Sequence, residues 1–451
     1  MRPITLTPSS FKAAFALGVG LVALGGASAV QAQDAPPPPA PAPPANGPGP
    51  ATQPPPPPGT ALPGPTQPTA APTPPGTATD PNAPAAPAAT PPPNYKLQYN
   101  GLVDGYYLFN FHNPKDISTG GGHPYYDTRH NSPALSLAEM NVFQNAAPKS
   151  FGYKVTFMTG DTADINHYGV GSSLGEARYK NVQQLYGTYS FGSDASGIDV
   201  GKFYTPFGYE VTESNGNYNY SRSTAFGILP FYHAGARIYT PVPGLAGLTA
   251  TFYIVNGVYN TPTLGVQNDS KRPGYIGQLN YTDPKGKFTL ISELGLGKQK
   301  LFGPDTKVVL NDNNFTYNLN ANQLIGLDYE YGKNTSEGLP KTTYNGYAVY
   351  YRQALTAKTA LALRFSGVDA KTDEFTTSDG EITSTVDAAH VRPYDITATY
   401  EVKAAPNFLT RFEYRHDHSN IPSFFGGSSD PNNLRKDQDT LSLSGVFTFA
   451  Q

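Results

Sequence analysis

The sequence predicts an all-β protein, a transmembrane antiparallel β-barrel of about 16 strands that is preceded by a disordered proline-rich segment. Three observations predict this fold. From Tyr95 onward, apolar and polar residues alternate in short segments, which is the period of a β-strand. Short and long connections alternate between these segments, as in outer-membrane barrels. After the N-terminal segment, no apolar run of roughly 18 residues occurs, so membrane-spanning helices are not expected.

The composition excludes several classes of protein. Charged residues make up 14% of the chain and the formal net charge is −3, so we expect no nucleic acid partner. The absence of cysteine excludes disulfide scaffolds, thiol catalysis and cysteine zinc sites. Glycine, proline and tyrosine number 46, 45 and 31, which favours strands joined by turns over a coiled coil.

Residues 1–32 have the features of a secretory signal peptide. Arg2 and Lys12 supply positive charge, and residues 13–24 form a short apolar stretch. Residues 30–32, Val-Gln-Ala, match a small-residue cleavage site. We therefore expect the mature chain to begin near Gln33 and to reach the bacterial outer membrane.

Residues 33–94 are expected to form a disordered periplasmic segment. Proline occupies 26 of the 60 positions from 34 to 93, and no aromatic residue occurs there, so the segment cannot bury a core. Such a chain samples extended polyproline II conformations. Two interpretations remain open: an inert spacer, or a tether that engages the cell wall or a periplasmic partner.

Residues 95–451 are expected to form the barrel. In residues 407–417, Phe412 and Tyr414 alternate with Arg411, Glu413 and Arg415, so the two faces of this strand meet different surroundings. Residues 440–451 alternate in the same way. In a soluble sandwich the apolar face would be the core, whereas in a membrane barrel it would meet lipid, and alternation alone does not decide between them.

The lengths of the connections favour the membrane barrel. Short connections are expected at 146–150, 193–196, 241–246, 283–286, 355–357 and 404–406, and long ones at 112–133, 160–180, 206–232, 368–390 and 418–436. Fifteen strand candidates are evident, but the order of short and long connections breaks near Lys298. A strand at 313–320, followed by a tight turn near Ala321, restores the order and gives sixteen strands.

Three segments carry a resemblance to a known family. They are residues 202–210 (KFYTPFGYE), 219–223 (NYSRS) and 233–237 (HAGAR), supported upstream by residues 102–107 (LVDGYY) and the hairpin expected at 139–160. This pattern resembles the OmpL-like β-barrel porin family, over most of residues 95–451. The resemblance implies an outer-membrane barrel with pore activity and implies no particular solute.

The candidate site residues are charged side chains on the polar faces of the strands. At sixteen strands a barrel is wide enough to hold water, so such side chains are expected to line a pore. The expected pore-lining residues are Lys154, Glu293, Asp328, Glu330, Arg364, Asp395, Glu401, Arg411, Glu413 and Arg415. We expect no catalytic, cofactor or metal site, because no motif for one stands in a suitable context.

The connection at 206–232 is a candidate constriction loop. By the resemblance to large porins, the third long loop folds into the barrel, and this one carries Glu210, Glu213 and Arg222 among many aromatic residues. An external loop whose aromatic side chains pack on one another is the alternative. Charges in a narrow pore act strongly on passing ions, so Arg222 is expected to tune ion preference.

The function expected from these features is passive diffusion of small polar solutes or ions, without enzymatic activity. The partners expected are outer-membrane lipid and the solutes themselves, and a homotrimer remains open as the assembly. The alternatives are a structural or adhesive barrel whose proline-rich segment is the working part, and a barrel enzyme with a serine and a histidine at the lipid face.

Overall fold

The computed structural model describes most of the chain beyond Tyr95. The described residues are 95–114, 126–167, 181–193, 195–259, 272–300, 305–336, 339–373, 375–379, 382–386, 389–426 and 433–450. The signal peptide expected at 1–32 and the proline-rich segment expected at 33–94 lie outside the described residues.

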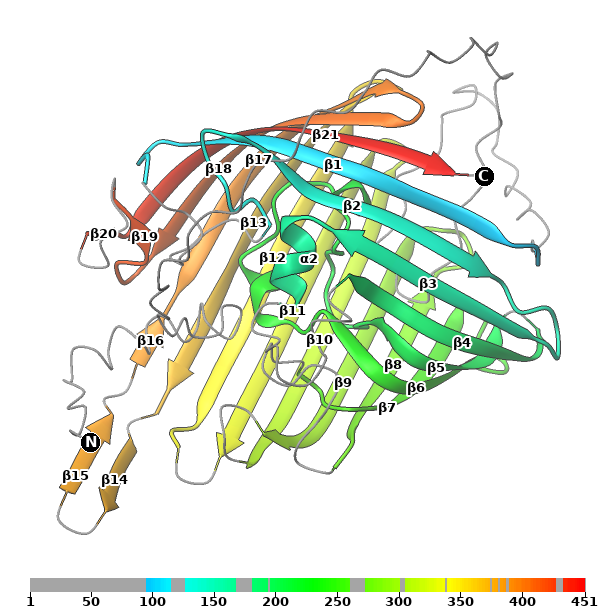
Figure 1. Ribbon diagram of the computed structural model, residues 1–451, viewed down its shortest axis with the longest axis horizontal. Helices are drawn as coiled ribbons and strands as arrows, with labels where there is room; N and C mark the ends of the chain where they lie inside the picture. The colour runs from blue at the N-terminus through cyan, green and yellow to red at the C-terminus, as the bar shows by residue number, and fades with distance from the viewer. Residues whose placement is uncertain are drawn as a thin grey trace, which may run out of the picture.

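Sixteen antiparallel strands close into one barrel, which confirms the predicted fold class and strand count. They are β1 (Gln98–Asn110), β2 (Pro133–Gln144), β3 (Phe151–Thr159), β4 (Val182–Ser193), β5 (Ser196–Tyr204), β6 (Tyr232–Pro241), β7 (Leu248–Val255), β8 (Gly274–Thr282), β9 (Phe288–Lys300), β10 (Asp305–Asn320), β11 (Gln323–Ser336), β12 (Thr342–Ala354), β13 (Thr359–Thr372), β17 (Pro393–Ala405), β18 (Phe408–Ser419) and β21 (Asp437–Ala450). Each strand pairs with the next, and β1 pairs with β21 to close the barrel. Figure 1 shows these first and last strands, cyan and red, side by side.

Smaller elements occupy the connections. A short strand, β16 (Ala389–Val391), pairs with the end of β13, and two small hairpins pair β14 (Phe375–Asp379) with β15 (Ile382–Val386) and β19 (Phe424–Phe425) with β20 (Leu434–Arg435). The helical pieces are α2 (Asp161–Asn166), η3 (Ser214–Gly216) and η4 (Ala225–Ile228). Within the described part of the chain, no helix has the length and apolar character needed to cross a membrane.

The strand β10 is longer than the sequence analysis predicted. It begins at Asp305 rather than at residue 313, and its first half pairs with β9 from Asp305↔Lys300 onward. Asn311 and Asp312, directly before the predicted strand, have the composition of a turn, so the sequence predicts no strand before residue 313. Because β9 and β10 are joined by only residues 301–304 at the rim of the long loops, the simple order of short and long connections breaks there.

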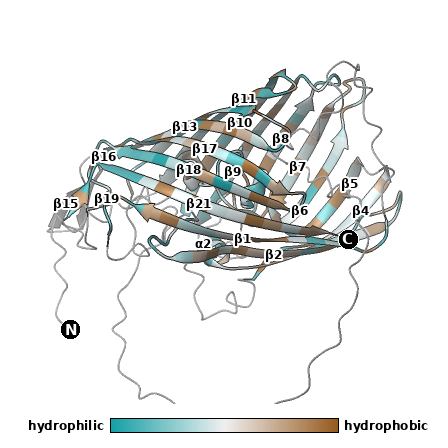
Figure 2. Cartoon of the chain, turned by 90° about the horizontal axis from the view of Figure 1, so that it is seen from above, coloured by the Kyte–Doolittle hydropathy of each residue, from teal (hydrophilic) through white to brown (hydrophobic). Residues whose placement is uncertain are grey.

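The two faces of the wall are those of a membrane barrel. In β18, Phe412 on the outer face is 52% exposed, whereas the neighbouring Glu413 on the inner face is 4% exposed. Large apolar side chains stand exposed on the outer face of nearly every strand, where a soluble sandwich would bury them. Figure 2 shows hydrophobic and hydrophilic residues interspersed along the strands. The burial pattern therefore decides between the two interpretations that alternation left open.

Aromatic rings line the outer face near the rim of the short connections. Phe151 and Tyr189 have ring centroids 5.0 Å apart, and Phe288 packs 5.5 Å from Tyr281 and 6.0 Å from Phe315. Aromatic rings with an apolar body favour the membrane interface. The rings thus mark one edge of the band that meets lipid.

Candidate functional site

The connection between β5 and β6, residues 205–231, lies inside the barrel. We call it the inner loop, and it is the third long connection on its rim, which is where the sequence analysis placed the candidate constriction. Asn219, Tyr220 and Ser221 near its middle are at most 1% exposed. Since both ends of the inner loop leave the wall at β5 and β6, its contacts with other strands show how far it reaches.

The first part of the inner loop contacts β10 and β12. The amide of Gly208 donates to Asp312 Oδ2 at 2.5 Å, and the Tyr209 hydroxyl lies 2.9 Å from Thr316 Oγ1. The Tyr209 ring stacks on Tyr350 of β12, with centroids 4.6 Å apart. Apolar packing and hydrogen bonds therefore hold this part of the loop to the wall.

The middle of the inner loop contacts β1, where the barrel closes. Asp104 accepts hydrogen bonds from Ser214 Oγ at 2.6 Å and from the Tyr220 hydroxyl at 3.1 Å. The Tyr220 ring also packs 6.0 Å from the ring of Tyr106 on the same strand. Because β1 is four strands before β5, the loop extends well away from its own base.

Glu413 of β18 accepts the backbone of the inner loop. Its carboxylate receives the amide of Tyr220 at 2.6 Å and the amide of Ser221 at 2.9 Å. Thr399 of β17 donates its hydroxyl to the same carboxylate at 2.6 Å and receives the Asn219 amide at 2.7 Å. Three donors therefore converge on this one buried carboxylate, two of them backbone amides of the inner loop.

Arg411 of β18 holds the loop at η3. Its guanidinium donates to the carbonyl oxygens of Ser214 at 2.9 Å and Asn217 at 2.7 Å, and forms an ion pair with Glu401 at 2.9 Å. Glu401 is shared with Arg352, whose guanidinium lies 2.9 Å from the other carboxylate oxygen. The ion pairs thus fix the arginine that binds the loop.

Arg364 of β13 and Arg415 of β18 bind the next stretch. Arg364, with a fully buried side chain, donates to the carbonyl of Ser221 at 2.5 Å and pairs with Asp395 and Glu210, each at 3.0 Å. Arg415 donates to the carbonyl of Arg222 and to Asp417. We call Arg364, Arg411 and Arg415 the arginine clamp, since each binds carbonyl oxygens of the inner loop through charge-assisted hydrogen bonds.

Arg222 stabilises the fold of the inner loop itself. Its guanidinium donates to the carbonyl oxygens of Val211 at 2.9 Å, Tyr220 at 2.5 Å and Thr212 at 2.5 Å. It also lies 5.1 Å from the centre of the Tyr126 ring, which belongs to the first long connection. Arg222 therefore holds several turns of the loop together in addition to carrying a charge.

The two acidic residues expected in the constriction, Glu210 and Glu213, both lie in the first half of the inner loop. Glu213 accepts the hydroxyl of Tyr204 at 2.7 Å, and Glu210 accepts the amide of Ser223 at 2.6 Å besides pairing with Arg364. Their carboxylates are thus engaged by the wall and by the loop.

The first long connection packs against the inner loop. The Tyr126 ring lies 5.8 Å from Phe226, and the Tyr126 hydroxyl donates to Asn166 of α2 at 2.6 Å. The neighbouring Asp127 is 3% exposed, and burial raises the pKa of its carboxyl to about 7, with the nearby charge of Glu413 adding to the effect. Asp127 therefore titrates close to neutral pH.

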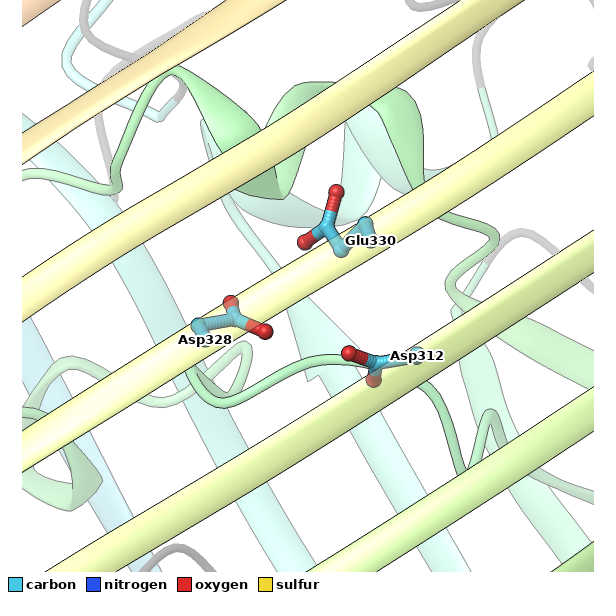
Figure 3. Close-up of side chains that lie close together, drawn as sticks. All are labelled: Asp312, Asp328 and Glu330. Carbon is cyan, nitrogen blue, oxygen red and sulfur yellow. The ribbon is translucent and has the colours of Figure 1, made fainter.

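A second group of acidic residues lies on three neighbouring strands, β9, β10 and β11. Glu293, Asp312 and Glu330 face one another across the two strand pairs, and Asp328 stands two residues before Glu330. All four side chains are buried on the inner face. Figure 3 shows Asp312, Asp328 and Glu330 on neighbouring strands with their carboxylates close together. We call these last three the carboxylate cluster.

The ten residues expected to line the pore all stand on the inner face of the wall. The structure brings Arg364, Asp395, Glu401, Arg411, Glu413 and Arg415 together around the inner loop, and Glu293, Asp328 and Glu330 together on β9 and β11. Lys154 of β3 lies close enough to Glu139 of β2 and Glu213 of the inner loop to interact with their charges. Whether these residues line an open pore remains a prediction.

Sequence reasoning missed Asp104 and Asp312, which bind the inner loop from β1 and β10. Asp104 lies in the segment Leu102–Tyr107 that carried the family resemblance, but its role requires knowing that Ser214 and Tyr220 reach it. Asp312 was hidden by the turn-like composition around it. Because side chains alternate between the two faces of a strand, following the inner face along the full length of β10 identifies Asp312 as an inner residue.

Solved structures with a similar fold include outer-membrane proteins and porins. The chain is similar to a loop L8 deletion mutant of OmpT, an outer membrane protein of Vibrio cholerae, with 12% identity and a TM-score of 0.50 over 78% of this chain and 99% of that one. It is equally similar to an anion-selective porin from Comamonas acidovorans, with 12% identity, a TM-score of 0.50, and coverage of 78% and 99%. OmpF of Salmonella typhi, solved in complex with daunomycin, gives 14%, 0.50, and coverage of 79% and 98%. At these identities the likeness shows the fold alone.

The family is shown by the sequence as a whole. No curated protein gives a significant match. The family model described as "Putative beta-barrel porin-2, OmpL-like" matches residues 96–449, which is the whole of the described barrel apart from its last residue and Tyr95. This chain therefore belongs to the OmpL-like β-barrel porin-2 family, and it is a porin-like barrel of the bacterial outer membrane.

Proposed function

We propose that this protein is a channel for passive diffusion of small polar solutes or ions, and that the inner loop forms its constriction. The observation that carries the proposal is the course of residues 205–231, which leave the wall at β5 and β6 and bind β1, β10, β13, β17 and β18. A segment held across the interior of a barrel narrows it, and a sixteen-stranded barrel without such a segment is wide enough for an aqueous channel.

The charged side chains of the wall support this function in a specific way. The guanidinium groups of Arg364, Arg411 and Arg415 donate to carbonyl oxygens of the inner loop and pair with acidic residues. They therefore fix the shape of the constriction. A constriction that is held by buried ion pairs keeps one size, which suits sieving of solutes by size. We propose no catalytic step for any of these residues.

Conductance of the purified chain in planar lipid bilayers tests the proposal. We expect stepwise single-channel currents, and we expect deletion of residues 214–223 to raise the conductance of each step, because this stretch receives the contacts from Asp104, Glu413 and the arginine clamp. A barrel that assembles normally and conducts no ions would contradict the channel and favour a structural or adhesive role. Unchanged conductance in the deletion would contradict the constriction.

We also propose the domain organisation expected from the sequence. Residues 1–32 would be removed on export, and residues 33–94 would extend into the periplasm as a proline-rich spacer before β1. N-terminal sequencing of protein from outer membranes tests the first statement, with a start near Gln33 expected and a start at Met1 contradicting it. Protease added to intact cells should spare residues 33–94, whereas cleavage there would reverse the assigned orientation.

A further inference from the structure

Three buried carboxylates lie close together on the inner face of the wall. They are Asp312 of β10 and Asp328 and Glu330 of β11, the carboxylate cluster. One oxygen of each lies within 4.8 Å of one oxygen of every other. Figure 3 shows that the three side chains converge from the two strands. Among the described contacts, the inner loop reaches the cluster through one hydrogen bond, from the amide of Gly208 to Asp312.

Four of the six carboxylate oxygens of the cluster are buried without a hydrogen-bond donor among the described residues. Among the described residues, both carboxylate oxygens of Glu330, Oδ1 of Asp312 and Oδ1 of Asp328 are buried without a partner. A neutral group shares this state: the Asn314 amide donates to Asp312 Oδ2 at 3.0 Å, so its carboxamide lies against the cluster, and its own buried Oδ1 has no partner. Buried carboxylate oxygens without a donor from the protein are free to bind an ion or water.

No basic side chain compensates these charges in the described part of the barrel. The ion pairs there include Arg364 with Glu210 and Asp395, but none reaches the carboxylate cluster. Glu293, which faces Asp312 across the strand pair, adds a fourth buried carboxyl with an unpartnered oxygen. Carboxyl groups this close in a protein interior are neutralised either by a bound cation or by protons.

Two glycines next to the cluster allow Glu330 and Tyr209 to approach the backbone closely. At Gly346 of β12, a Cβ atom would lie 2.3 Å from Oε2 of Glu330. At Gly326 of β11, a Cβ atom would lie 2.3 Å from the Tyr209 hydroxyl of the inner loop. A side chain at Gly346 would displace the Glu330 carboxylate, and one at Gly326 would displace Tyr209 of the inner loop. The absence of a side chain at both positions therefore permits the observed geometry of the cluster.

We propose that the carboxylate cluster binds a divalent cation of the calcium class. Calcium takes oxygen ligands at roughly 2.3–2.6 Å, so oxygens on opposite sides of the ion are separated by roughly 4.6–5.2 Å. The 4.8 Å limit of the cluster fits that range. Asp312 and Asp328 each offer one free oxygen and Glu330 offers two, while Asn314 offers an amide oxygen, with water completing the shell. An all-oxygen set favours calcium or magnesium over zinc or copper.

The proposed ion would connect the wall with the inner loop. Asp312 would bind the ion with Oδ1 while Oδ2 accepts the amide of Gly208, and Tyr209 lies beside Gly326. The bound ion would therefore fix the first part of the inner loop, from a site two strands away from Arg364 of the arginine clamp. This inference does not depend on which solute crosses the channel.

Terbium luminescence tests the site directly. Tb³⁺ prefers the same oxygen ligands, and because the chain has tyrosine but no tryptophan, emission excited near the tyrosine band reports an ion close to residues such as Tyr209. The full-length mature chain, folded in detergent and treated with chelator, should give saturable emission with one ion per barrel. Ca²⁺ should displace Tb³⁺, and Mg²⁺ should do so less well because its shell is smaller and holds water more tightly.

Matched variants separate this site from other acidic residues. Asp328→Asn and Glu330→Gln should each weaken Tb³⁺ binding at least about tenfold, since even residues that only orient ligands affect metal affinity to that degree. Asp199→Asn is the control, because Asp199 is also a buried carboxylate of the inner face but is paired with Arg237 at 2.8 Å. It should leave Tb³⁺ binding unchanged.

Two results would overturn the proposal. One is the absence of saturable emission in the folded chain, which would mean that protons neutralise the cluster. The other is equal binding in Asp328→Asn, Glu330→Gln and the control, which would place the ion elsewhere. Conductance is measured separately, so a barrel that binds Tb³⁺ without conducting would contradict only the proposed channel.

Discussion

Two sectors of the inner wall both carry buried carboxylates, but only one of them pairs these carboxylates with arginine among the described residues. On β13, β17 and β18, the carboxylates of Asp395, Glu401 and Asp417 are each paired with an arginine. On β10 and β11, Asp312, Asp328 and Glu330 are as deeply buried and have no basic partner among the described residues. The difference lies in the neighbours, since both sectors are antiparallel strands of one barrel.

The comparison shows what arginine contributes to the first sector. Each arginine of the clamp neutralises an acidic residue and still has N–H groups left for carbonyl oxygens of the inner loop. A carboxylate without such a partner has no donor of its own to offer to the loop. The first sector can therefore bind carbonyl oxygens of the inner loop, whereas the second can only accept donors such as the Gly208 amide.

The same substitution should have opposite effects in the two sectors. Asp395→Asn leaves Arg364 and Arg415 without their shared carboxylate, and breaking a buried ion pair costs about 3–5 kcal/mol of unfolding free energy. Asp328→Asn removes one of several repelling charges, so in the presence of chelator it should leave the stability unchanged or raise it. Unfolding by denaturant in detergent measures both. A loss of similar size in Asp328→Asn would show that the two sectors do not differ.

Replacing one arginine of the clamp by lysine should loosen the inner loop without removing charge. In Arg411→Lys, a single ammonium cannot reach Ser214, Asn217 and Glu401 in the way that the planar guanidinium does. Loss of one charge-assisted hydrogen bond costs about 1.5–3 kcal/mol. We expect noisier single-channel currents and faster proteolysis at 214–217. Arg392→Lys, the same substitution at an exposed position between β16 and β17, serves as the control.

The pH dependence of stability should report Asp127, where the first long connection meets the inner loop. Burial raises its pKa from 3.8 to about 7, so the folded chain holds this proton more tightly than the unfolded chain does. The resulting stabilisation is complete below the unfolded pKa and is lost as pH rises from 3.8 to about 7. Asp127→Asn should flatten the fall in unfolding free energy between these values. An unchanged slope would mean that Asp127 is ionised in the folded state.

Labelling of single cysteines should distinguish the two rims of the barrel. The chain has no cysteine, so Asp373→Cys beyond β13 and Lys285→Cys between β8 and β9 are unique labels. Both positions are exposed. A reagent that does not cross the membrane should modify the first and spare the second on intact cells, with little effect on stability. Equal labelling would overturn the orientation that places the long loops outside.

The barrel could be predicted because each strand carries its own signal. Alternation in a segment such as residues 407–417 depends only on which side each residue faces, and the turn near Ala321 needed only local composition. The predicted start of β10 was wrong for the same reason. Asn311 and Asp312 have the local composition of a turn, and only pairing with β9 and β11 makes them strand. Local signals fail where neighbouring strands supply the hydrogen bonds.

The sequence by itself determined the closed barrel, the inner position of the charged residues and the loop that carries Glu210, Glu213 and Arg222. These follow from periodicity, parity and composition, which act over a few residues. Only the tertiary structure decided that Arg364, Arg411 and Arg415 bind this loop and that Asp312 joins Asp328 and Glu330. Such partners are set by cross-strand register and by a loop that returns to strands far away in sequence, and Coulomb and hydrogen-bond energies depend on those distances in space rather than on spacing along the chain.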